Sequence, residues 1–307
     1  MARAMLLAGN NPLFKTRPKL SVRIGKYTYA LETNGSDSTY SVSDGSRSVS
    51  LPIRWTFGLR MQTWVLEQDG HYYESMVSYY PSINGLATTV GDDKLAAGTL
   101  EEALGRELTA SETRQCFGCH ASNAVSDGQL TLSTLQPGIT CEHCHAGATG
   151  HLLDTLQGYF DSPPRSLKKL SSEEILDFCG QCHRTWETVT RKGTRGVSNV
   201  RFQPYRLANS KCFDGADPRI SCIVCHDPHT DVVRDASTYD TTCLACHAAK
   251  GSGQRVSEQP RSKACPVGTA KCTSCHMPKV EVNTPAGLIT FTDHTIRRGL
   301  PGEPYPN

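Results

Sequence analysis

The chain has 307 residues, enough for one large domain or two smaller ones. Hydrophobic residues make up 37% and aromatic residues 7%, which is little for a polypeptide of this length that must bury a core of its own. The formal net charge is +2, no basic run indicates nucleic acid as a partner, and no apolar stretch approaches the 18 or more residues of a transmembrane segment.

Residues from about 19 to 85 alternate polar with β-favouring residues, a pattern that is typical of half-buried strands. The clearest runs are KLSVRIGKYTY, RSVSL and QTWVL. Three dipeptides between strand-like runs are hairpin-turn signals: Asn34-Gly35, Asp44-Gly45 and Asp69-Gly70. We predict that residues 1–98 form a β-rich N-terminal region with a small antiparallel sheet.

From residue 99 the pattern becomes helical. Thr99 and Thr109 are suitable N-caps for the segments LEEALGREL and ASETRQC, and Ser171 opens a capping box before EEILDF. Long stretches without periodicity separate these segments, and the tail GLPGEPYPN is rich in proline and glycine. We predict that residues 99–307 form mostly short α-helices and loops.

The pentapeptide Cys-x-x-Cys-His occurs six times in this region, and we number the copies in chain order. In such a sequence both thiols add to the vinyl groups of a haem, and the adjacent imidazole binds the iron as the proximal ligand. A single copy would also fit a redox motif or half a zinc site, but neither requires a histidine after every cysteine pair. Six copies therefore predict six covalently bound haem c groups.

The attachment cysteines are Cys116 and Cys119, Cys141 and Cys144, Cys179 and Cys182, Cys222 and Cys225, Cys243 and Cys246, and Cys272 and Cys275. The proximal ligands of the haem irons are His120, His145, His183, His226, His247 and His276. Porphyrins are large apolar plates, so they can supply the core that the composition lacks. The predicted fold class is a multihaem cytochrome c, in which residues 99–307 pack around six haems and the β-rich region 1–98 carries none.

Two of the 14 cysteines, Cys212 and Cys265, lie outside the motifs. Haem attachment takes place outside the cytoplasm, where spare thiols tend to be oxidised, so we predict a disulfide between them, the alternative being two buried free thiols. The expected localisation is periplasmic or extracellular. The start MARAMLLAGNNPLFK is a poor signal peptide, so a leader has been removed or the chain is part of a longer product.

Five histidines remain as distal ligands for the opposite faces of six haems. His229 lies three residues after His226, so both project to nearly the same side and His229 is expected to reach a neighbouring iron. His151 follows His145 by six residues and fits the same reasoning, while His294 lies beyond the last motif and could fold back over the haems.

The other two histidines have competing explanations. His143 lies inside its own motif and is either an exposed filler or a ligand, and His71 follows a hairpin turn, which is more typical of an exposed side chain. One to three haems are therefore expected to lack a distal histidine from this chain. Such a haem would be five-coordinate, bind a methionine (Met61, Met76 or Met277), or take a ligand from another subunit.

The order CFGCH, GITCEHCHAGATGH, FCGQCHRTW, ISCIVCHDPHT and TTCLACH resembles the haem core shared by pentahaem nitrite reductase, octahaem hydroxylamine oxidoreductase and the tetrahaem electron carrier that partners the latter. The segments NVRFQPYRLANSKCF, CPVGTAKCTSCHMPK and FTDHTIRR are similar to exported bacterial multihaem cytochromes related to that carrier. The resemblance covers roughly residues 50 to 299. It implies neighbouring porphyrins that alternate between parallel stacking and near-perpendicular contact.

The resemblance also implies that the haem at Cys116, Cys119 and His120 is the candidate open site. The similar enzyme has lysine where this chain has His120, and it has an active-site tyrosine where this chain offers Trp186. We find no counterpart to its active-site histidine before CIVCH, although Arg114 could serve as a positive group. These departures argue against nitrite or hydroxylamine chemistry, and no catalytic residue is assigned.

The leading prediction is electron transfer by hopping along six haems. The expected partners are redox proteins or further copies of the chain, the latter in an extracellular filament that would act as a nanowire. The alternative is a haem oxidoreductase acting on a small nitrogen or sulfur compound at a five-coordinate haem. A third hypothesis is a haem-bearing subunit of a larger membrane complex.

Overall fold

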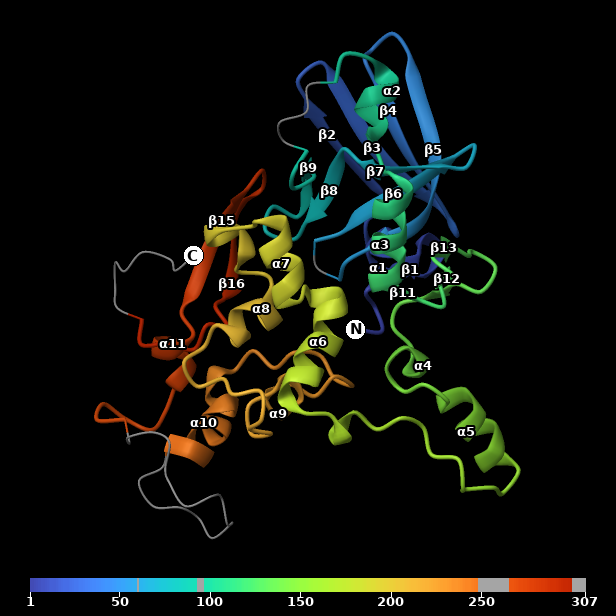
Figure 1. Ribbon diagram of the computed structural model, residues 1–307. Helices are drawn as coiled ribbons and strands as arrows, with labels where there is room; N and C mark the ends of the chain where they lie inside the picture. Colours follow the sequence, from blue (N-terminus) through green and yellow to red (C-terminus); the bar gives the residue numbers. More distant parts are fainter. Residues whose placement is uncertain (60, 93–96, 248–264, 300–307) are drawn as a thin grey trace. The chain divides into compact units, whose positions relative to one another are not determined.

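The computed structural model describes residues 1–59, 61–92, 97–247 and 265–299 (Figure 1). The chain divides into two compact units. Unit 1 comprises Met1–Ser166 and Asn283–Gly287, and unit 2 comprises Leu167–Val282 and Leu288–Asn307. The predicted boundary at residue 98 separates the sequence without Cys-x-x-Cys-His motifs from the sequence that contains them. The compact units are defined instead by contacts between residues in space, and the first two motifs belong to unit 1. Which residues carry haem stays a prediction.

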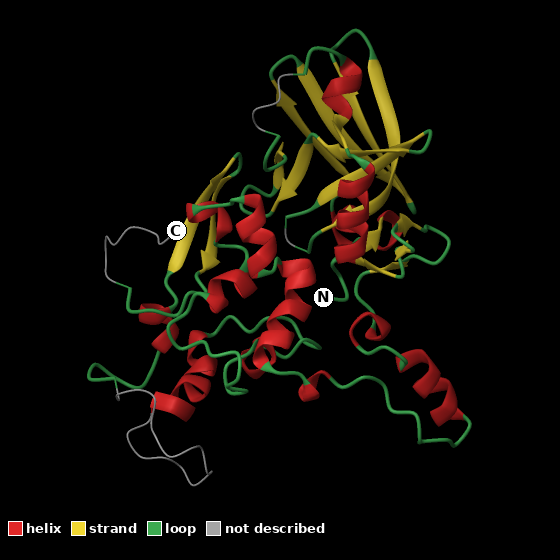
Figure 2. Cartoon of the chain, viewed as in Figure 1, coloured by secondary structure: helices red, strands yellow, loops and turns green. Residues whose placement is uncertain are grey.

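Unit 1 is built on an eight-stranded antiparallel sheet (Figure 2). The strand order is β10-β7-β6-β5-β4-β3-β2, with β1 also paired to β5. The strands are β1 (Met5–Leu7), β2 (Lys19–Ile24), β3 (Tyr27–Asn34), β4 (Asp37–Ser43), β5 (Ser48–Phe57), β6 (Thr63–Gln68), β7 (His71–Ser75) and β10 (Gly105–Glu107). A separate hairpin consists of β8 (Val77–Tyr80) and β9 (Gly85–Thr88).

Hairpin turns lie at the three dipeptides that the sequence singles out. Gly35 has φ +63° and Gly45 has φ +92°. Asp69 and Gly70 have φ +52° and +81° between the paired residues Gln68 and His71, as a type I′ turn requires. Only glycine adopts such angles without strain, and aspartate tolerates them better than most residues.

The sheet is larger than the small region predicted from the alternation, because β1 and β10 lie outside residues 19 to 85. Met5 of β1 is completely buried, and so is Phe14 of helix α1 (Pro12–Thr16) apart from 1% of its surface. Asn11 caps α1 by accepting a hydrogen bond from the backbone N–H of Leu13. The segment that resembles a poor signal peptide is thus part of the core of unit 1.

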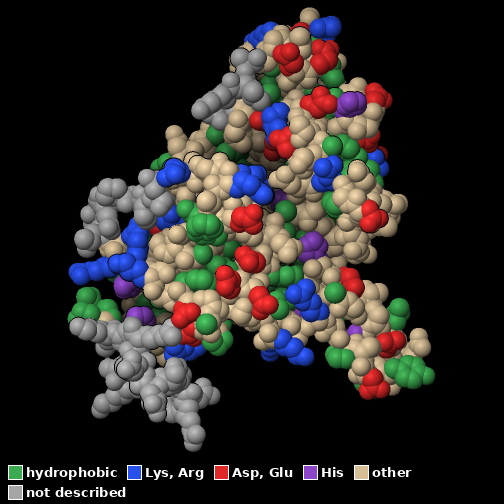
Figure 3. All heavy atoms as spheres, viewed as in Figure 1, with side chains coloured by type: hydrophobic (Ala, Val, Ile, Leu, Met, Phe, Trp, Pro, Cys, Tyr) green, Lys and Arg blue, Asp and Glu red, His purple; other side chains and the backbone are tan. Residues whose placement is uncertain are grey.

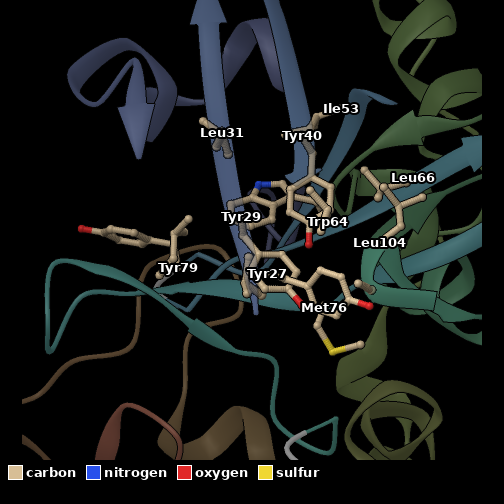
Figure 4. Close-up of a cluster of buried hydrophobic side chains, with 14 of the residues drawn as sticks. Tyr27, Tyr29, Leu31, Tyr40, Ile53, Trp64, Leu66, Met76, Tyr79 and Leu104 are labelled. Carbon is tan, nitrogen blue, oxygen red and sulfur yellow. The ribbon is translucent and has the colours of Figure 1, made fainter. Parts of the chain in front are cut away.

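Apolar side chains cover both faces of the central strands. Trp64 and Leu66 of β6 belong to one cluster, in which Tyr40 lies against Trp64 at a ring separation of 6.1 Å (Figure 4). Val65 points to the other face, where it joins a second cluster with Trp55 and Phe117. Successive residues of a strand point to opposite faces of the sheet. Because both faces of β6 are buried here, the apolar residues Trp64, Val65 and Leu66 follow one another without a polar residue between them.

The remaining elements of unit 1 are short. The helices are α2 (Leu100–Leu104), α3 (Ala110–His120), α4 (Cys141–Cys144) and α5 (Ala148–Leu156). Two small hairpins are formed by β11 (Ala121–Ser122) with β14 (Gln136–Pro137) and by β12 (Val125–Ser126) with β13 (Gln129–Leu130). The predicted caps are confirmed: Thr99 and Thr109 each form a complete capping box at the start of α2 and α3.

Unit 2 consists of short helices, long connections and part of one hairpin. The helices are α6 (Ser172–His183), α7 (Trp186–Lys192), α8 (Gln203–Ala208), α9 (Cys222–Cys225), α10 (Asp240–His247) and α11 (Cys272–His276). Ser171 forms the predicted capping box of α6. The paired strands β15 (Lys279–Thr284) and β16 (Gly287–Thr292) were not predicted.

Acidic and basic side chains are interspersed on the face drawn in Figure 3, with hydrophobic side chains between them. Among the described residues, no helix is both long and apolar enough to cross a membrane.

Glu112 gives a pH-dependent contribution to the stability of α3. Its carboxylate accepts hydrogen bonds from the backbone and hydroxyl of Thr109, and pairs with Arg106 at 2.8 Å. These bonds lower the pKa of Glu112 from 4.5 to about 2. Because the folded pKa lies below the unfolded one, the contribution is complete above pH 4.5 and is lost as the pH falls towards 2.

We therefore expect Glu112→Gln to lower the free energy of unfolding by about 0.5–1 kcal/mol at pH 7, a figure reduced for partial exposure, and by less at pH 3. Urea unfolding followed by far-ultraviolet circular dichroism measures both values. Glu32→Gln is the control, since the carboxylate of Glu32 makes only an exposed 3.7 Å pair with Lys19. A difference between wild type and Glu112→Gln that grows towards pH 3 contradicts the prediction.

Candidate haem-binding site

Each of the six motifs includes one turn of helix. In α3, α6 and α10 the motif forms the C-terminal end of a longer helix, and in α4, α9 and α11 the helix begins at the first cysteine. Residues at positions i, i+3 and i+4 lie on the same side of a helix, so both thiols and the imidazole of a motif share one face. This arrangement is what attachment of a single porphyrin requires.

Backbone carbonyls from other parts of the chain hold three of the six motif histidines. Nδ1 of His120 lies 3.0 Å from the carbonyl oxygen of Ala4. Nδ1 of His145 lies 2.8 Å from that of Arg165, and Nδ1 of His276 lies 3.1 Å from that of Arg297. A carbonyl oxygen only accepts, so Nδ1 donates and Nε2 keeps its lone pair for a metal. The three residues therefore fit the role of iron ligand.

Burial keeps several of these imidazoles in the neutral form that binds metals. Desolvation lowers the pKa of His120, an effect that the hydrogen bond to Ala4 partly offsets. Desolvation also lowers the pKa of His226 and of His143. A neutral imidazole at physiological pH needs no deprotonation before it binds iron.

The first motif is packed against the sheet of unit 1 by its own second residue, Phe117, which is completely buried. The Phe117 ring makes edge-to-face contacts with Trp55 at 5.1 Å and Phe57 at 5.3 Å. Phe57 in turn contacts the ring of His120 at 5.2 Å. The β-rich region thus fixes the orientation of the first motif through aromatic packing.

Neighbouring motifs of unit 2 contact each other through their first cysteines. The thiol of Cys179 lies close enough to that of Cys222 to raise, together with burial, the pKa of Cys222, and α6 packs against α9. The thiols of Cys243 and Cys272 likewise lie close together, and α10 packs against α11. The third motif therefore lies beside the fourth, and the fifth beside the sixth.

Asp240 joins the helices of the last two motifs. It is the first residue of α10, yet its carboxylate accepts hydrogen bonds from the backbone N–H groups of Lys271 and Cys272 at 2.6 and 2.8 Å. Those groups open α11, where a carboxylate interacts favourably with the N-terminal end of the helix. One side chain thereby fixes the start of the sixth motif relative to the fifth.

The five distal candidates have different surroundings. His71 and His229 are exposed, and their Nδ1 atoms lie 2.7 Å from Glu107 and 2.9 Å from Asp227. His143 lies within α4 and is exposed. Nδ1 of His151, in α5, is buried without a hydrogen-bond partner among the described residues. Distal ligation by these four histidines stays a prediction.

His294 lies beside a motif histidine. The rings of His294 and His226 have centroids 6.2 Å apart. Nδ1 of His294 lies 3.0 Å from the carbonyl oxygen of Thr292. Burial, opposed in part by this hydrogen bond, lowers the pKa of His294 to about 4, so the ring is neutral at pH 7.

Other residues singled out from the sequence have the following positions. Cys212 and Cys265 carry separate, exposed thiols, so the predicted disulfide is absent from the structure and remains a prediction. Met76 is buried in the cluster of Figure 4, where the side chain packs in the sheet core of unit 1. Trp186 is the exposed first residue of α7, and Arg114 lies on α3 two residues before Cys116.

A family model described as "Cytochrome c554 and c-prime" matches residues 88–146, a segment that contains the first two motifs. The match supports a c-type cytochrome family, covalently bound haem c and haem-based electron transfer in general. Searches of curated proteins and of solved structures found no match.

Phe117 provides a test of the packing between the first motif and the sheet. Phe117→Ala removes a fully buried ring and is expected to lower the free energy of unfolding by about 3–5 kcal/mol. Phe160→Ala is the matched control in the same unit, because Phe160 is 69% exposed, and its expected effect is below about 0.5 kcal/mol. Denaturant unfolding measures both, and equal effects of the two substitutions contradict the packing described above.

Proposed function

Because the family match supports a c-type cytochrome, we propose that this chain transfers electrons by hopping along six covalently bound haem c groups. The proposed localisation is periplasmic or extracellular, since haem attachment takes place outside the cytoplasm. The proposed fold class is a multihaem cytochrome c in which short helices and loops surround the haems. The observation that carries the proposal is the pairing of motifs in unit 2.

Electrons move rapidly only between closely spaced redox centres, so the distance between attachment sites matters. The first cysteines of the third and fourth motifs lie next to each other, and so do those of the fifth and sixth. A haem attached at each of these cysteines would have its edge next to that of its neighbour. This proximity supports two pairs of haems suited to fast exchange.

The apolar burial of unit 2 supports the same proposal. Its described residues bury six hydrophobic side chains, namely Leu167, Ile175, Leu176, Val189, Val200 and Leu207. Both hydrophobic clusters formed by the described residues belong to unit 1. Six side chains are few for a compact unit of this length, because burial of apolar surface is the main force that favours folding. Apolar porphyrin surface would make up the difference.

The cysteines, histidines and backbone carbonyls of the chain have different roles in this proposal. Haem c, when bound, supplies an iron that accepts and releases one electron. The cysteines of each motif fix the orientation of the ring, and the histidine binds the iron through Nε2. The carbonyls of Ala4, Arg165 and Arg297 hold the Nδ1 hydrogen of three histidines and so increase the basicity of these ligands. Differences in burial and hydrogen bonding would give the six irons different potentials.

The expected partners are redox proteins or further copies of the chain. A filament, in which a partner copy supplies a missing distal ligand, is one form of the proposal, and imaging of the native protein decides it. The alternative is an oxidoreductase acting on a small nitrogen or sulfur compound at a five-coordinate haem. A subunit of a larger membrane complex is a third form, which co-purification tests.

The number of haems is tested by mass spectrometry of the denatured holoprotein, because thioether-bound haem stays on the chain. We expect six haems on the wild type and five on Cys243→Ser/Cys246→Ser, which removes one attachment pair. Cys212→Ser is the control and should retain six, since Cys212 lies outside the motifs. Fewer than six on fully matured wild type contradicts the proposal.

The choice between carrier and enzyme is tested by electron paramagnetic resonance of the oxidised holoprotein. The electron-transfer function predicts spectra dominated by low-spin iron that do not change on addition of nitrite or hydroxylamine. A high-spin signal that responds to either compound, or to nitric oxide, supports the oxidoreductase instead. Reductive titration completes the test, and an electron carrier with six haems takes up six electrons per chain.

A further inference from the structure

The rings of His226 and His294 lie close together within unit 2, with centroids 6.2 Å apart and planes inclined by 40°. A metal-bound imidazole nitrogen lies about 2 Å from the metal and about 1 Å from the centre of its own ring, so two imidazoles on opposite sides of one iron have centroids about 6 Å apart. The observed separation fits this geometry. Ordinary ring contacts cover the same range, so the inference also depends on what holds each ring.

The ring of His294 is held by a hydrogen bond of the kind that orients metal-binding histidines. Its Nδ1 donates to the carbonyl oxygen of Thr292 at 3.0 Å, which leaves the lone pair on Nε2. His120 and His276, which belong to attachment motifs, make the same kind of bond. His294 lies outside every motif and nevertheless shares this feature with them.

A buried ion pair fixes the residue next to His294. Arg206 of α8 and Asp293 are 2% and 0% exposed at their side chains. Nε of Arg206 donates to Oδ1 of Asp293 at 3.0 Å, and Nη2 donates to Oδ2 at 3.1 Å. This two-point contact sets both the distance and the orientation of the carboxylate, which a single bond would not do.

Further bonds connect the segment after β16 to α8 and its surroundings. Nη1 of Arg206 donates to the side-chain oxygen of Asn199, and Oγ1 of Thr295 donates to the carbonyl oxygen of Arg206. Ser210 donates to the carbonyl oxygen of His294 itself at 2.9 Å. Buried ion pairs add little to stability but can specify one register, and here the register decides where His294 lies.

We propose that His294 is the second axial ligand of the haem iron bound by His226, and that Arg206 is a positioning residue that holds His294 opposite His226. The proposal rests on the proposed function, because it requires a haem c at Cys222 and Cys225. The competing recipient is the iron of the third motif, since His183 also interacts electrostatically with His294. The separation of 6.2 Å between the rings favours His226.

His294→Ala in the holoprotein tests the ligand. We expect six attached haems by mass spectrometry, as in the wild type, and a new high-spin ferric signal from about one sixth of the iron. Added imidazole should convert this signal back to low-spin. Thr290→Ala is the control, because Thr290 is exposed on β16 of the same segment and should leave the spectrum unchanged.

The outcomes separate this inference from the proposed function. A wild type without covalent haem overturns the proposed function. Six haems with an entirely low-spin spectrum in His294→Ala overturn the inference alone. A variant that does not mature is replaced by His294→Met, which retains a possible ligand. That variant is expected to stay low-spin with a raised potential at one haem, and six unchanged potentials overturn the inference.

The identity of the iron is tested by removing the fourth haem with Cys222→Ala/Cys225→Ala. In that background His294→Ala is expected to add no high-spin iron, since its target is already gone. A new high-spin signal there assigns His294 to another haem and overturns the pairing. The crystal structure of the holoprotein gives an independent answer from the iron to which Nε2 of His294 is bonded.

The positioning role of Arg206 is tested by Arg206→Lys, which keeps the charge but loses the two-point contact. We expect part of the iron that His294→Ala makes high-spin to become high-spin here too, with imidazole restoring it. The double variant Arg206→Met/Asp293→Leu removes both charges of this pair together, so that neither member is left buried alone, while Arg297 loses its 3.8 Å contact with Asp293. If both holoproteins stay entirely low-spin, Arg206 has no positioning role.

Discussion

An imidazole binds a metal well only when its second ring nitrogen is held, and in this chain the backbone provides much of that support. The carbonyls of Ala4, Arg165 and Arg297 hold the Nδ1 atoms of three motif histidines. The acceptors lie just before β1, in the segment after α5 and in the segment after β16, so each of these motifs is joined to a part of the chain 20 or more residues away.

The two units hold their motifs in place by different means. Unit 1 has apolar clusters on both faces of its central strands, and Phe117 brings the first motif into one of them. Unit 2 buries few aliphatic side chains, and its described segments are joined by polar contacts such as the Arg206–Asp293 pair and the Asp240 cap. Polar contacts specify a geometry more strictly than apolar packing does, which suits a unit whose motifs must keep fixed relative positions.

Local features of the fold could be predicted from the sequence, and non-local ones could not. The turn at Asp69-Gly70 and the caps at Thr109 and Ser171 depend on residues within four positions of each other. Strand β1 is too short to show a period, and β15 alternates polar with apolar residues over only six positions, which does not reveal its pairing with β16. Pairing partners of such strands depend on the rest of the chain.

The same distinction applies to the candidate site. The spacing of each Cys-x-x-Cys-His motif is readable because the chemistry needs those residues in sequence. The backbone acceptor of His120 is not readable, since the carbonyl of Ala4 is chemically identical to that of any other residue. Arg206 and Asp293 are 87 residues apart, and neither has a local pattern that distinguishes it from a surface charge. From the sequence alone, Met76 is a possible iron ligand. Its burial in the sheet core depends on tertiary structure, so it can be read only from the fold.

The distance along the chain between Arg206 and Asp293 has a consequence for the order of assembly. A chain is synthesised from its N-terminus, so α8 and the fourth motif exist before Asp293 and His294 do. Burying the Arg206 guanidinium before Asp293 is present would be costly, because this carboxylate contacts it at two points. The packing around α8 therefore depends on a residue that follows the last motif.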